Sequence, residues 1–207
     1  MPTKIAIFAS GDGTNAQALI DAASGGALGD SEIALILSDR PDAGVLDRAE
    51  TSGIEALFVD PTSYSGRSAY GEALAKHLKE RSIELVCLAG FMRILAANFI
   101  KAYEGRILNV HPALLPSFPG ARAVRDALEW GAKITGATVH FADEKADHGP
   151  IIFQESVDVR TGDTEETLHE RIKEVEHRLY PKAVRAVVDG KVRVQGRQVT
   201  VDEEART

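Results

Sequence analysis

Residues 4–15, KIAIFASGDGTN, decide the fold, because they join a short apolar run to a turn that contains two glycines. Unalternating runs rich in β-branched residues are typical of strands that are buried on both faces. After the turn, Ala16, Leu19, Ile20 and Ala23 recur with the spacing of one helix face. This stretch therefore predicts a buried strand, a tight turn and an amphipathic helix.

The same order of strand and helix is repeated through the first 90 residues. Further strands are predicted at 32–38, 55–59 and 83–89, with helices at 43–51 and 68–79. Such alternation predicts parallel strands joined by right-handed helical crossovers. We therefore expect an α/β fold with a doubly wound, mostly parallel sheet and helices on both faces.

The pattern changes after Gly90, although no repeat or low-complexity linker separates a second domain. Strands are predicted at 106–110, 137–142 and 150–157, a helix at 123–130, a long helix that ends at Gly190, and a hairpin at 192–201. The long helix has an apolar stripe of Leu168, Ile172, Val175 and Leu179. Asp163 with Glu166 predicts its N-terminal cap, and Pro181 predicts a kink or a break. One continuous domain is the simplest interpretation.

Composition bounds the class of protein. The chain has 207 residues, 44% of them hydrophobic and 27% charged, with a net charge of −7. This is ordinary for a globular protein, and the acidic balance argues against broad nucleic-acid or anionic-membrane binding. No apolar run approaches the roughly 20 residues of a membrane helix, and residues 1–25 lack the layout of a signal peptide. We expect a cytoplasmic protein.

The turn at residues 10–15 (SGDGTN) predicts an anion site. Backbone N–H groups at the start of a helix converge on an anion, and glycine lets that anion approach closely. The sequence lacks the third glycine of the dinucleotide fingerprint and the Gly-Lys-Ser/Thr of a Walker loop. A monophosphate site is the better interpretation, with Arg67 as a second charge. The alternatives are a tight turn that needs a positive φ, and a solvated surface arginine.

The stretch Asn109-Val-His111-Pro112 is the most informative for chemistry. Residues i and i+2 of a strand face the same way, so the Asn109 amide and the His111 imidazole converge at the end of a strand. Asp147 precedes Gly149-Pro150 and can reach the same place. An amide, an imidazole and a carboxylate together suit acyl transfer. The alternative is a turn at Asn109 and His111 with a loop cap at Asp147.

Two other kinds of chemistry are not favoured. Cys87 is the only cysteine and lies in the middle of a predicted strand, so we expect a packed thiol rather than a nucleophile. Transfer would then be direct, without a covalent enzyme intermediate. His111, His140 and His148 lack the spacing typical of zinc ligands, so we expect no metal.

Several motifs together resemble those of the phosphoribosylglycinamide formyltransferases, a family of folate-dependent enzymes. The motifs are SGDGTN at 10–15, AGFMRIL at 89–95, NVHPALLPSFPG at 109–120, TGATVHFADEKADHGPIIFQ at 135–154 and VEHRLYP at 175–181. They follow one another through nearly the whole chain. The resemblance implies transfer of a formyl group from 10-formyltetrahydrofolate to the amine of glycinamide ribonucleotide, in de novo purine synthesis.

The resemblance also implies roles for individual residues. Asn109, His111 and Asp147 would be the catalytic residues. The substrate-binding residues would be Gly13, Thr14, Asn15 and Arg67 at the phosphate, Glu176 at the ribose, and Pro112; the folate-binding residues would be Met92, Arg93, Ile94, Leu95 and Asn109. Without the resemblance, residues 92–95 would pass for a packed linker and Glu176 for a solvated helix charge.

The same comparison divides the chain and shows two departures. We expect a nucleotide-phosphate-binding half at 1–90, a catalytic and folate-binding half at 91–190, and a hairpin and tail at 191–207. Arg122 stands where the family often has histidine, and we expect an effect on substrate positioning or pH dependence. His148 is bulkier than the small residues common at its position, and a solvent-exposed turn residue is the favoured interpretation.

Three other functions remain as alternatives. A hydrolase would pass the formyl group to water, although the related deformylases usually carry a regulatory domain for which 207 residues leave no room. Formylation of aminoacyl-tRNA is disfavoured by the acidic charge and by the lack of a C-terminal nucleic-acid module. The third alternative is a non-catalytic folate- or nucleotide-binding module. We expect a monomer or a homodimer that binds neither nucleic acid nor membrane.

Overall fold

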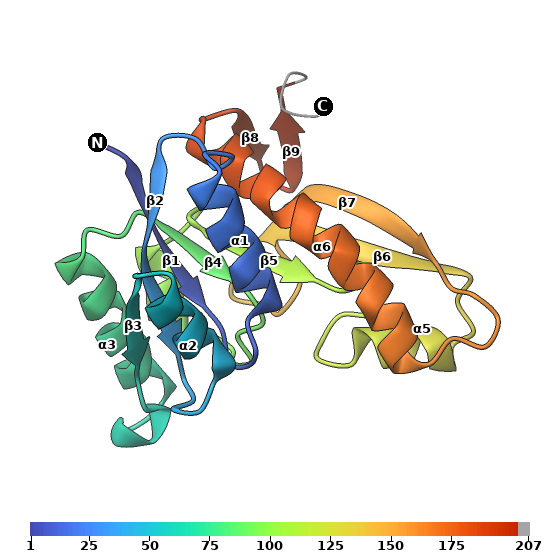
Figure 1. The fold of residues 1–207 in the computed structure, drawn as a ribbon, viewed down its shortest axis with the longest axis horizontal. Coiled ribbons are helices and arrows are strands. Elements are labelled where there is room, and N and C mark those ends of the chain that lie inside the picture. The colour runs from blue at the N-terminus through green and yellow to red at the C-terminus, as the bar shows by residue number, and fades with distance from the viewer. Residues whose placement is uncertain (203–207) are drawn as a thin grey trace.

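The computed structural model describes residues 1–202, and its centre is a seven-stranded sheet (Figure 1). The strand order is β3-β2-β1-β4-β5-β6-β7. The strands are β1 (Thr3–Phe8), β2 (Ser31–Ser38), β3 (Glu55–Phe58), β4 (Leu85–Leu88), β5 (Ile107–His111), β6 (Ile134–Phe141) and β7 (Ile151–Asp158). The first five are parallel and the last two antiparallel to their neighbours, so the mostly parallel α/β sheet is confirmed.

Helices connect and cover these strands. They are α1 (Thr14–Ser24), α2 (Gly44–Thr51), α3 (Arg67–Glu80), α4 (Ala97–Ala102), α5 (Ala123–Glu129) and α6 (Glu165–Val188). A 3₁₀ turn at Pro61–Ser63 precedes α3, and the predicted hairpin is formed by β8 (Val192–Gln195) and β9 (Gln198–Val201). The sequence did not predict α4 or the 3₁₀ turn. The tail of the predicted hairpin segment, residues 203–207, lies outside the described residues.

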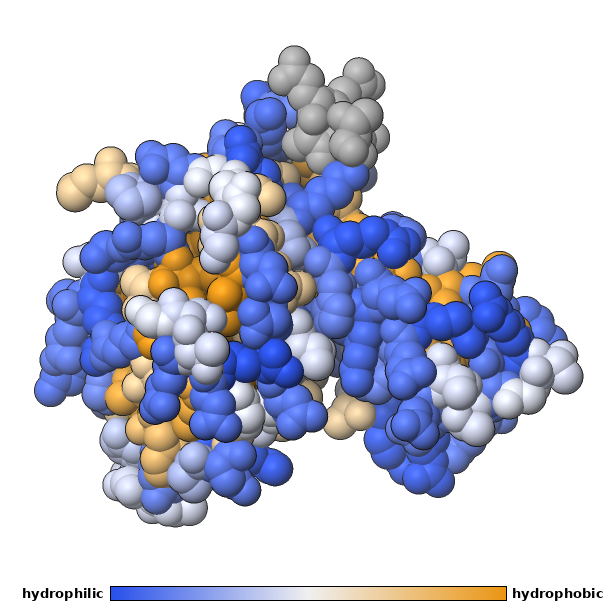
Figure 2. All heavy atoms as spheres, in the orientation of Figure 1, coloured by the Kyte–Doolittle hydropathy of each residue, from blue (hydrophilic) through white to orange (hydrophobic). Residues whose placement is uncertain are grey.

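Two apolar layers lie on opposite faces of the sheet. One contains side chains of α1, α2 and α6 against strand residues such as Ile5, Ile7 and Leu108. The other contains side chains of α3 and α4 against residues such as Ala6 and Phe8. Successive residues of β1 therefore contribute to opposite layers, because successive side chains of a strand point to opposite faces of the sheet. The face of the molecule that Figure 2 shows is mostly hydrophilic, with apolar residues visible between the elements.

The long helix α6 corrects two expectations. It runs unbroken from Glu165 to Val188 through Pro181, so of the predicted kink or break the break is wrong and the kink stays a prediction. Burial of Leu179, Tyr180, Ala183 and Val184 on both sides of the proline explains this, because tertiary packing offsets the hydrogen bond that proline removes.

The predicted N-terminal cap of α6 is also wrong. The cap is Thr164, whose side chain accepts from the Thr167 backbone N–H while the Thr167 hydroxyl accepts from the Thr164 N–H. The Asp163 carboxylate instead accepts hydrogen bonds from Arg171 and from the backbone N–H of Arg160. A threonine pair thus replaces the expected Asp163 and Glu166.

Two further findings concern membrane crossing and the two predicted halves of the chain. Among residues 1–202, none of the helices combines the length and apolarity that crossing a membrane requires. The sheet is continuous across residue 90, because β4 pairs with β5. The strand ends of both predicted halves consequently meet at one edge.

Candidate active site

A cavity of about 620 Å³ lies where the carboxyl ends of β1, β4 and β5 meet the loop before β7 and one side of α6. Ligands in open α/β sheets bind at this edge, because the loops that follow parallel strands converge there. With one exception, all the residues to which the sequence assigned a role line the cavity: Gly13, Thr14, Asn15, Met92, Arg93, Ile94, Leu95, Asn109, His111, Pro112, Asp147 and Glu176. Its volume is typical of small-molecule sites.

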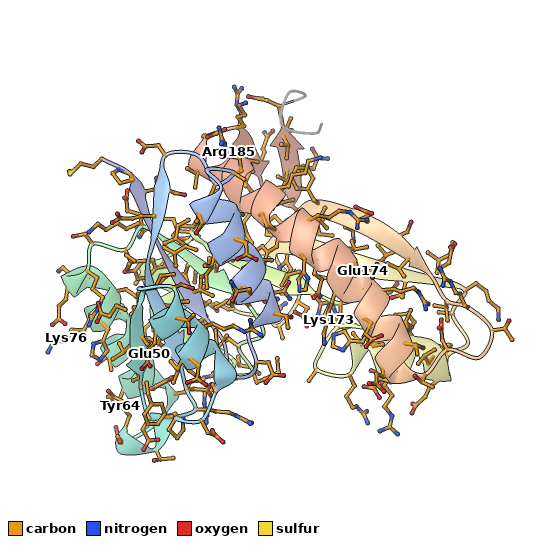
Figure 3. All side chains as sticks on the ribbon, viewed as in Figure 1. Glu50, Tyr64, Lys76, Lys173, Glu174 and Arg185 are labelled. Carbon is orange, nitrogen blue, oxygen red and sulfur yellow. The ribbon has the colours of Figure 1, made fainter. Side chains whose placement is uncertain are left out.

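The exception is Arg67, which is the first residue of α3. Its side chain is exposed and it is absent from the cavity lining. The cations that do line the cavity are Arg93, Lys145 and Lys173. Lys173 is labelled in Figure 3, where α6 passes the N-terminal end of α1. A phosphate contact from Arg67 stays a prediction.

The glycine turn after β1 has the geometry that an anion site requires. Gly13 has a φ of +74°, and a Cβ there would lie 2.5 Å from Cγ2 of Val45. Helix α1 begins at Thr14 without a side-chain cap, so its first N–H groups are left for a ligand. Gly13 therefore forms the tight turn and leaves the start of α1 without a side-chain cap.

The Asp147 carboxylate connects the catalytic candidates. Its Oδ1 lies 3.3 Å from the Asn109 amide nitrogen and 3.5 Å from Nδ1 of His111. Its Oδ2 accepts a 2.7 Å hydrogen bond from the backbone N–H of Gly120. Asp147 has a φ of +51°, a strained conformation that is found at functional sites. The three predicted residues therefore lie together.

Carbonyl partners define which ring nitrogen of each of the two histidines carries a hydrogen. Nε2 of His111 lies 2.8 Å from the Phe118 carbonyl, which can only accept, so this nitrogen carries a hydrogen. The other nitrogen of His111 faces Asp147 and forms an ion pair with it whenever the ring is protonated. Nδ1 of His140 likewise donates to the Phe141 carbonyl at 2.9 Å.

His140 is a neighbour of the catalytic candidates that the sequence did not assign. Its Nε2 lies 3.1 Å from the Asn109 amide nitrogen, and burial lowers its pKa, which favours the neutral ring. A neutral Nε2 accepts from Asn109 and fixes the amide orientation. The two side chains meet because Asn109 of β5 pairs with His140 of β6. Only knowledge of this antiparallel register could have predicted the contact from the sequence.

Glu176 is buried, contrary to the alternative of a solvated helix charge. It is 3% exposed, and its carboxylate accepts a 2.8 Å hydrogen bond from the Asn15 amide. Burial raises the pKa of Glu176 to about 7, although the hydrogen bond from Asn15 and the charge of Lys173 oppose this. The hydrogen bond between Asn15 and Glu176 joins α6 to the end of the glycine turn.

The segment that follows β4 forms an apolar wall of the cavity. Met92 and Ile94 are 65% and 60% exposed, which is unusual for such large apolar side chains. The segment lies beside the glycine turn, because the backbone N–H of Met92 donates to Oγ of Ser10 at 2.9 Å. Exposed apolar groups beside backbone donors suit a flat ring with a polar edge.

The remaining candidates have simpler surroundings. Cys87 is fully buried, and burial raises its pKa to about 12, so the expected packed thiol is confirmed. His148 is half exposed and its Nδ1 lies 2.7 Å from the Asp143 carboxylate. Arg122 is exposed and precedes α5. Within residues 1–202, no three His, Cys, Asp or Glu side chains are grouped so as to hold a metal ion.

The parallel sheet and the polar cluster at its edge together define an α/β enzyme of the group-transfer class. The sequence profile of the formyl transferase family matches residues 3–184. The chain belongs to this family.

Relatives with named activities agree. A phosphoribosylglycinamide formyltransferase of Bacillus subtilis is 40% identical over 185 residues, which are 89% of this chain and 94% of that protein. A trifunctional purine biosynthetic protein adenosine-3 of Gallus gallus is 48% identical over 92% of this chain, but this chain spans only 19% of its length.

Solved structures give the same family. The glycinamide ribonucleotide transformylase 1 of Symbiobacterium toebii has a TM-score of 0.95 at 45% identity, and the match covers 97% of this chain and 94% of the other. A formyltetrahydrofolate deformylase of Pseudomonas syringae is more distant, with 25% identity and a TM-score of 0.89, over 97% of this chain and 66% of the other.

Proposed function

We propose that this protein transfers the formyl group of 10-formyltetrahydrofolate to the amine of glycinamide ribonucleotide, in the synthesis of purines. The observation that carries the proposal is the position of Asn109, His111 and Asp147. They meet in a cavity that extends both to the Gly13 turn and to residues 91–95. A phosphorylated acceptor and a ring-bearing donor therefore reach the same polar groups.

The two ends of the cavity suit the two substrates. The phosphate of the ribonucleotide binds at the free N–H groups of α1, with Lys173 as a cation, and Glu176 accepts hydrogen bonds from the ribose. The pteridine ring of the folate binds against Met92 and Ile94, and its polar edge pairs with backbone groups. The 620 Å³ of the cavity is adequate for both reacting groups together.

The chemical step is a direct acyl transfer. The neutral amine attacks the formyl carbon, and the carbonyl oxygen becomes the oxyanion of a tetrahedral intermediate. The folate nitrogen then leaves, taking the proton that the amine has lost, and the products are the formylated ribonucleotide and tetrahydrofolate. No nucleophile of the protein takes part.

The polar groups divide this work. The His111 imidazole, beside Asp147, and the Asn109 amide stabilise the oxyanion. Both hydrogens of that amide have partners, at 3.1 Å in His140 and 3.3 Å in Asp147, so the oxyanion replaces the longer contact. Asp147, through water, assists proton movement from the amine to the folate nitrogen.

One assay separates the proposal from its alternatives. Purified protein is supplied with 10-formyltetrahydrofolate, and release of tetrahydrofolate is followed with and without glycinamide ribonucleotide. We expect release that depends strictly on the ribonucleotide, and its abolition in Asp147→Asn. Release without the ribonucleotide would identify a hydrolase. Binding of the folate without release would identify a non-catalytic module.

Location and assembly are also proposals. We place the reaction in the cytoplasm, as the composition led us to expect, and a reduced, buried Cys87 is compatible with it. Neither nucleic acid nor a membrane is a partner in this proposal. A monomer and a homodimer both remain compatible with it, and sedimentation equilibrium would distinguish them.

A further inference from the structure

Asp39 is a buried carboxylate that does not line the cavity. It follows the last residue of β2, and its side chain is 4% exposed. The carboxyl ends of β1 and β2 lie side by side in Figure 1, because the two strands are paired. Asp39 is thus placed behind the glycine turn, one strand further from the catalytic groups.

Both oxygens of Asp39 are connected to the segment that follows β4. Oδ1 accepts a 2.5 Å hydrogen bond from Oγ of Ser10, and that oxygen in turn accepts a 2.9 Å bond from the backbone N–H of Met92. Oδ2 accepts a 2.7 Å bond from Nε of Arg93. A single carboxylate therefore fixes two consecutive residues, one through its backbone and one through its side chain.

This segment has few other attachments. In the part of the chain that the structure describes, the bond from Met92 to Ser10 is the one hydrogen bond of the backbone at residues 91–95. The glycine turn differs, because the Gly11 carbonyl accepts from the Val45 N–H and the Asp12 carbonyl accepts from Arg48. Loss of Asp39 consequently loosens the segment at 91–95 more than it loosens the turn.

We propose that Asp39 is a positioning residue for the folate-binding segment, acting through Ser10 on the backbone of Met92 and directly on Arg93. This inference rests on the proposed function, which places the folate at that segment. A buried carboxylate that is paired and hydrogen-bonded holds its partners in one geometry, whereas an unpaired one is costly. Preformed backbone donors then meet the polar edge of the ring without an ordering cost.

The test separates the two substrates. In Asp39→Ala we expect the KM for 10-formyltetrahydrofolate to rise about tenfold, equivalent to about 1.4 kcal/mol. The KM for glycinamide ribonucleotide and kcat should stay within about twofold. Asp39→Asn keeps an acceptor for Ser10 but presents an N–H to Arg93, so it should restore only the part of the loss that runs through Ser10. Glu55→Ala, which removes the exposed carboxylate partner of Arg81, is the matched control and should change neither KM.

Several results would overturn the inference. They are an unchanged KM for the folate, an equal rise in both KM values, or a fall in kcat alone with both KM values unchanged. Thermal unfolding of each variant is measured in parallel. If Asp39→Ala does not fold, Ser10→Ala removes only the bridge to Met92, and it must then raise the KM for the folate selectively or the inference fails.

Direct binding distinguishes this inference from the proposed function. Calorimetric titration with tetrahydrofolate needs neither the ribonucleotide nor turnover. Weaker binding in Asp39→Ala by about tenfold supports the positioning role even if the wild-type protein shows no transfer activity. Equal affinities in the wild type and Asp39→Ala refute the role even if transfer activity is present.

Discussion

The side-chain amide of Asn15 donates a 2.8 Å hydrogen bond to the buried carboxylate of Glu176, which is 161 positions away in the sequence. This bond joins the beginning of α1 to the middle of α6. It places a titratable group next to the glycine turn at which we propose that the phosphate binds. The protonation of Glu176 consequently affects both stability and the substrate site.

We predict that Glu176 makes stability depend on pH. Burial raises the pKa of Glu176 to about 7, against roughly 4.3 in an unfolded chain. Folding therefore favours the neutral carboxyl, and its contribution is complete below about pH 4 and lost as the pH rises through 7. Glu176→Gln should be more stable than the wild type at pH 8 by on the order of 3 kcal/mol, and similar at pH 4.5. Urea unfolding at both pH values measures this; parallel pH curves would contradict it.

Asn109→Ala should lower kcat strongly. The amide is the neutral donor that we propose for the oxyanion, and removing one such donor typically costs about a hundredfold to a thousandfold. The KM values should change little, because the interaction belongs to the transition state. Ribonucleotide-dependent release of tetrahydrofolate is the measurement, and Asn98→Ala in α4, which does not line the cavity, is a control. Undiminished turnover in folded Asn109→Ala would refute the assignment.

Gly13→Ala should destabilise the fold by about 2–4 kcal/mol, because it combines a strained φ with a collision. The new Cβ would lie 2.5 Å from Val45 Cγ2. Gly11→Ala is a control in the same turn, since a Cβ there meets no atom within 4 Å. Adding Val45→Ala removes the contact with Cγ2 but leaves Cβ of residue 45 at 2.7 Å, so it should relieve little of the loss. Urea unfolding measures all four proteins, and equal stability of the two glycine variants would contradict the argument.

We expect Lys173 and Arg67 to contribute differently to binding of the phosphate. Lys173 lines the cavity and Arg67 does not. Lys173→Gln should raise the KM for the ribonucleotide by about tenfold, as loss of one charge-assisted hydrogen bond would. Arg67→Gln should raise it less. The reverse order, measured at saturating folate, would mean that α3 moves toward the turn when the phosphate binds.

Arg197 should stabilise the loop that carries Asp147. It lies in the β8–β9 hairpin, outside the matched family region, and donates a 2.7 Å hydrogen bond to the His148 carbonyl. We expect Arg197→Ala to increase hydrogen exchange in residues 142–149 by about two- to fivefold, since exposed bonds of this kind contribute about 0.5–1 kcal/mol. Arg193→Ala, on the exposed part of the same hairpin, should leave the exchange unchanged. Identical exchange in both variants would exclude the contact as a stabiliser.

Periodicity was sufficient for much of the fold. The strand and helix order of the first 90 residues follows from runs such as residues 4–8, because a buried parallel sheet needs continuous apolar strands. It failed at α4, whose six residues are too few to show a period. It also failed at Pro181, where packing around Tyr180 outweighs local preference.

The candidate site was less accessible to sequence reasoning. Asn109 and His111 could be paired because they are two residues apart in one strand. His140 and Lys173 could not be assigned to the site from the sequence, since the β5–β6 register and the rotation of α6 bring them to the cavity. The carboxylate of Asp39 gives no signal at all, because its partners Ser10 and Arg93 lie 29 and 54 positions away.

The apolar layer that contains residues of both β1 and α6 has a consequence for biosynthesis. Ile5 and Ile7 emerge from the ribosome at the start, yet Ile172 and Val184, which share their apolar layer, are among the last residues to appear. The N-terminal part of the growing polypeptide therefore exposes part of one apolar face of its strands until translation is nearly finished. Ribosome-bound fragments that stop before residue 165 should recruit holding chaperones, and release of the finished polypeptide should free them.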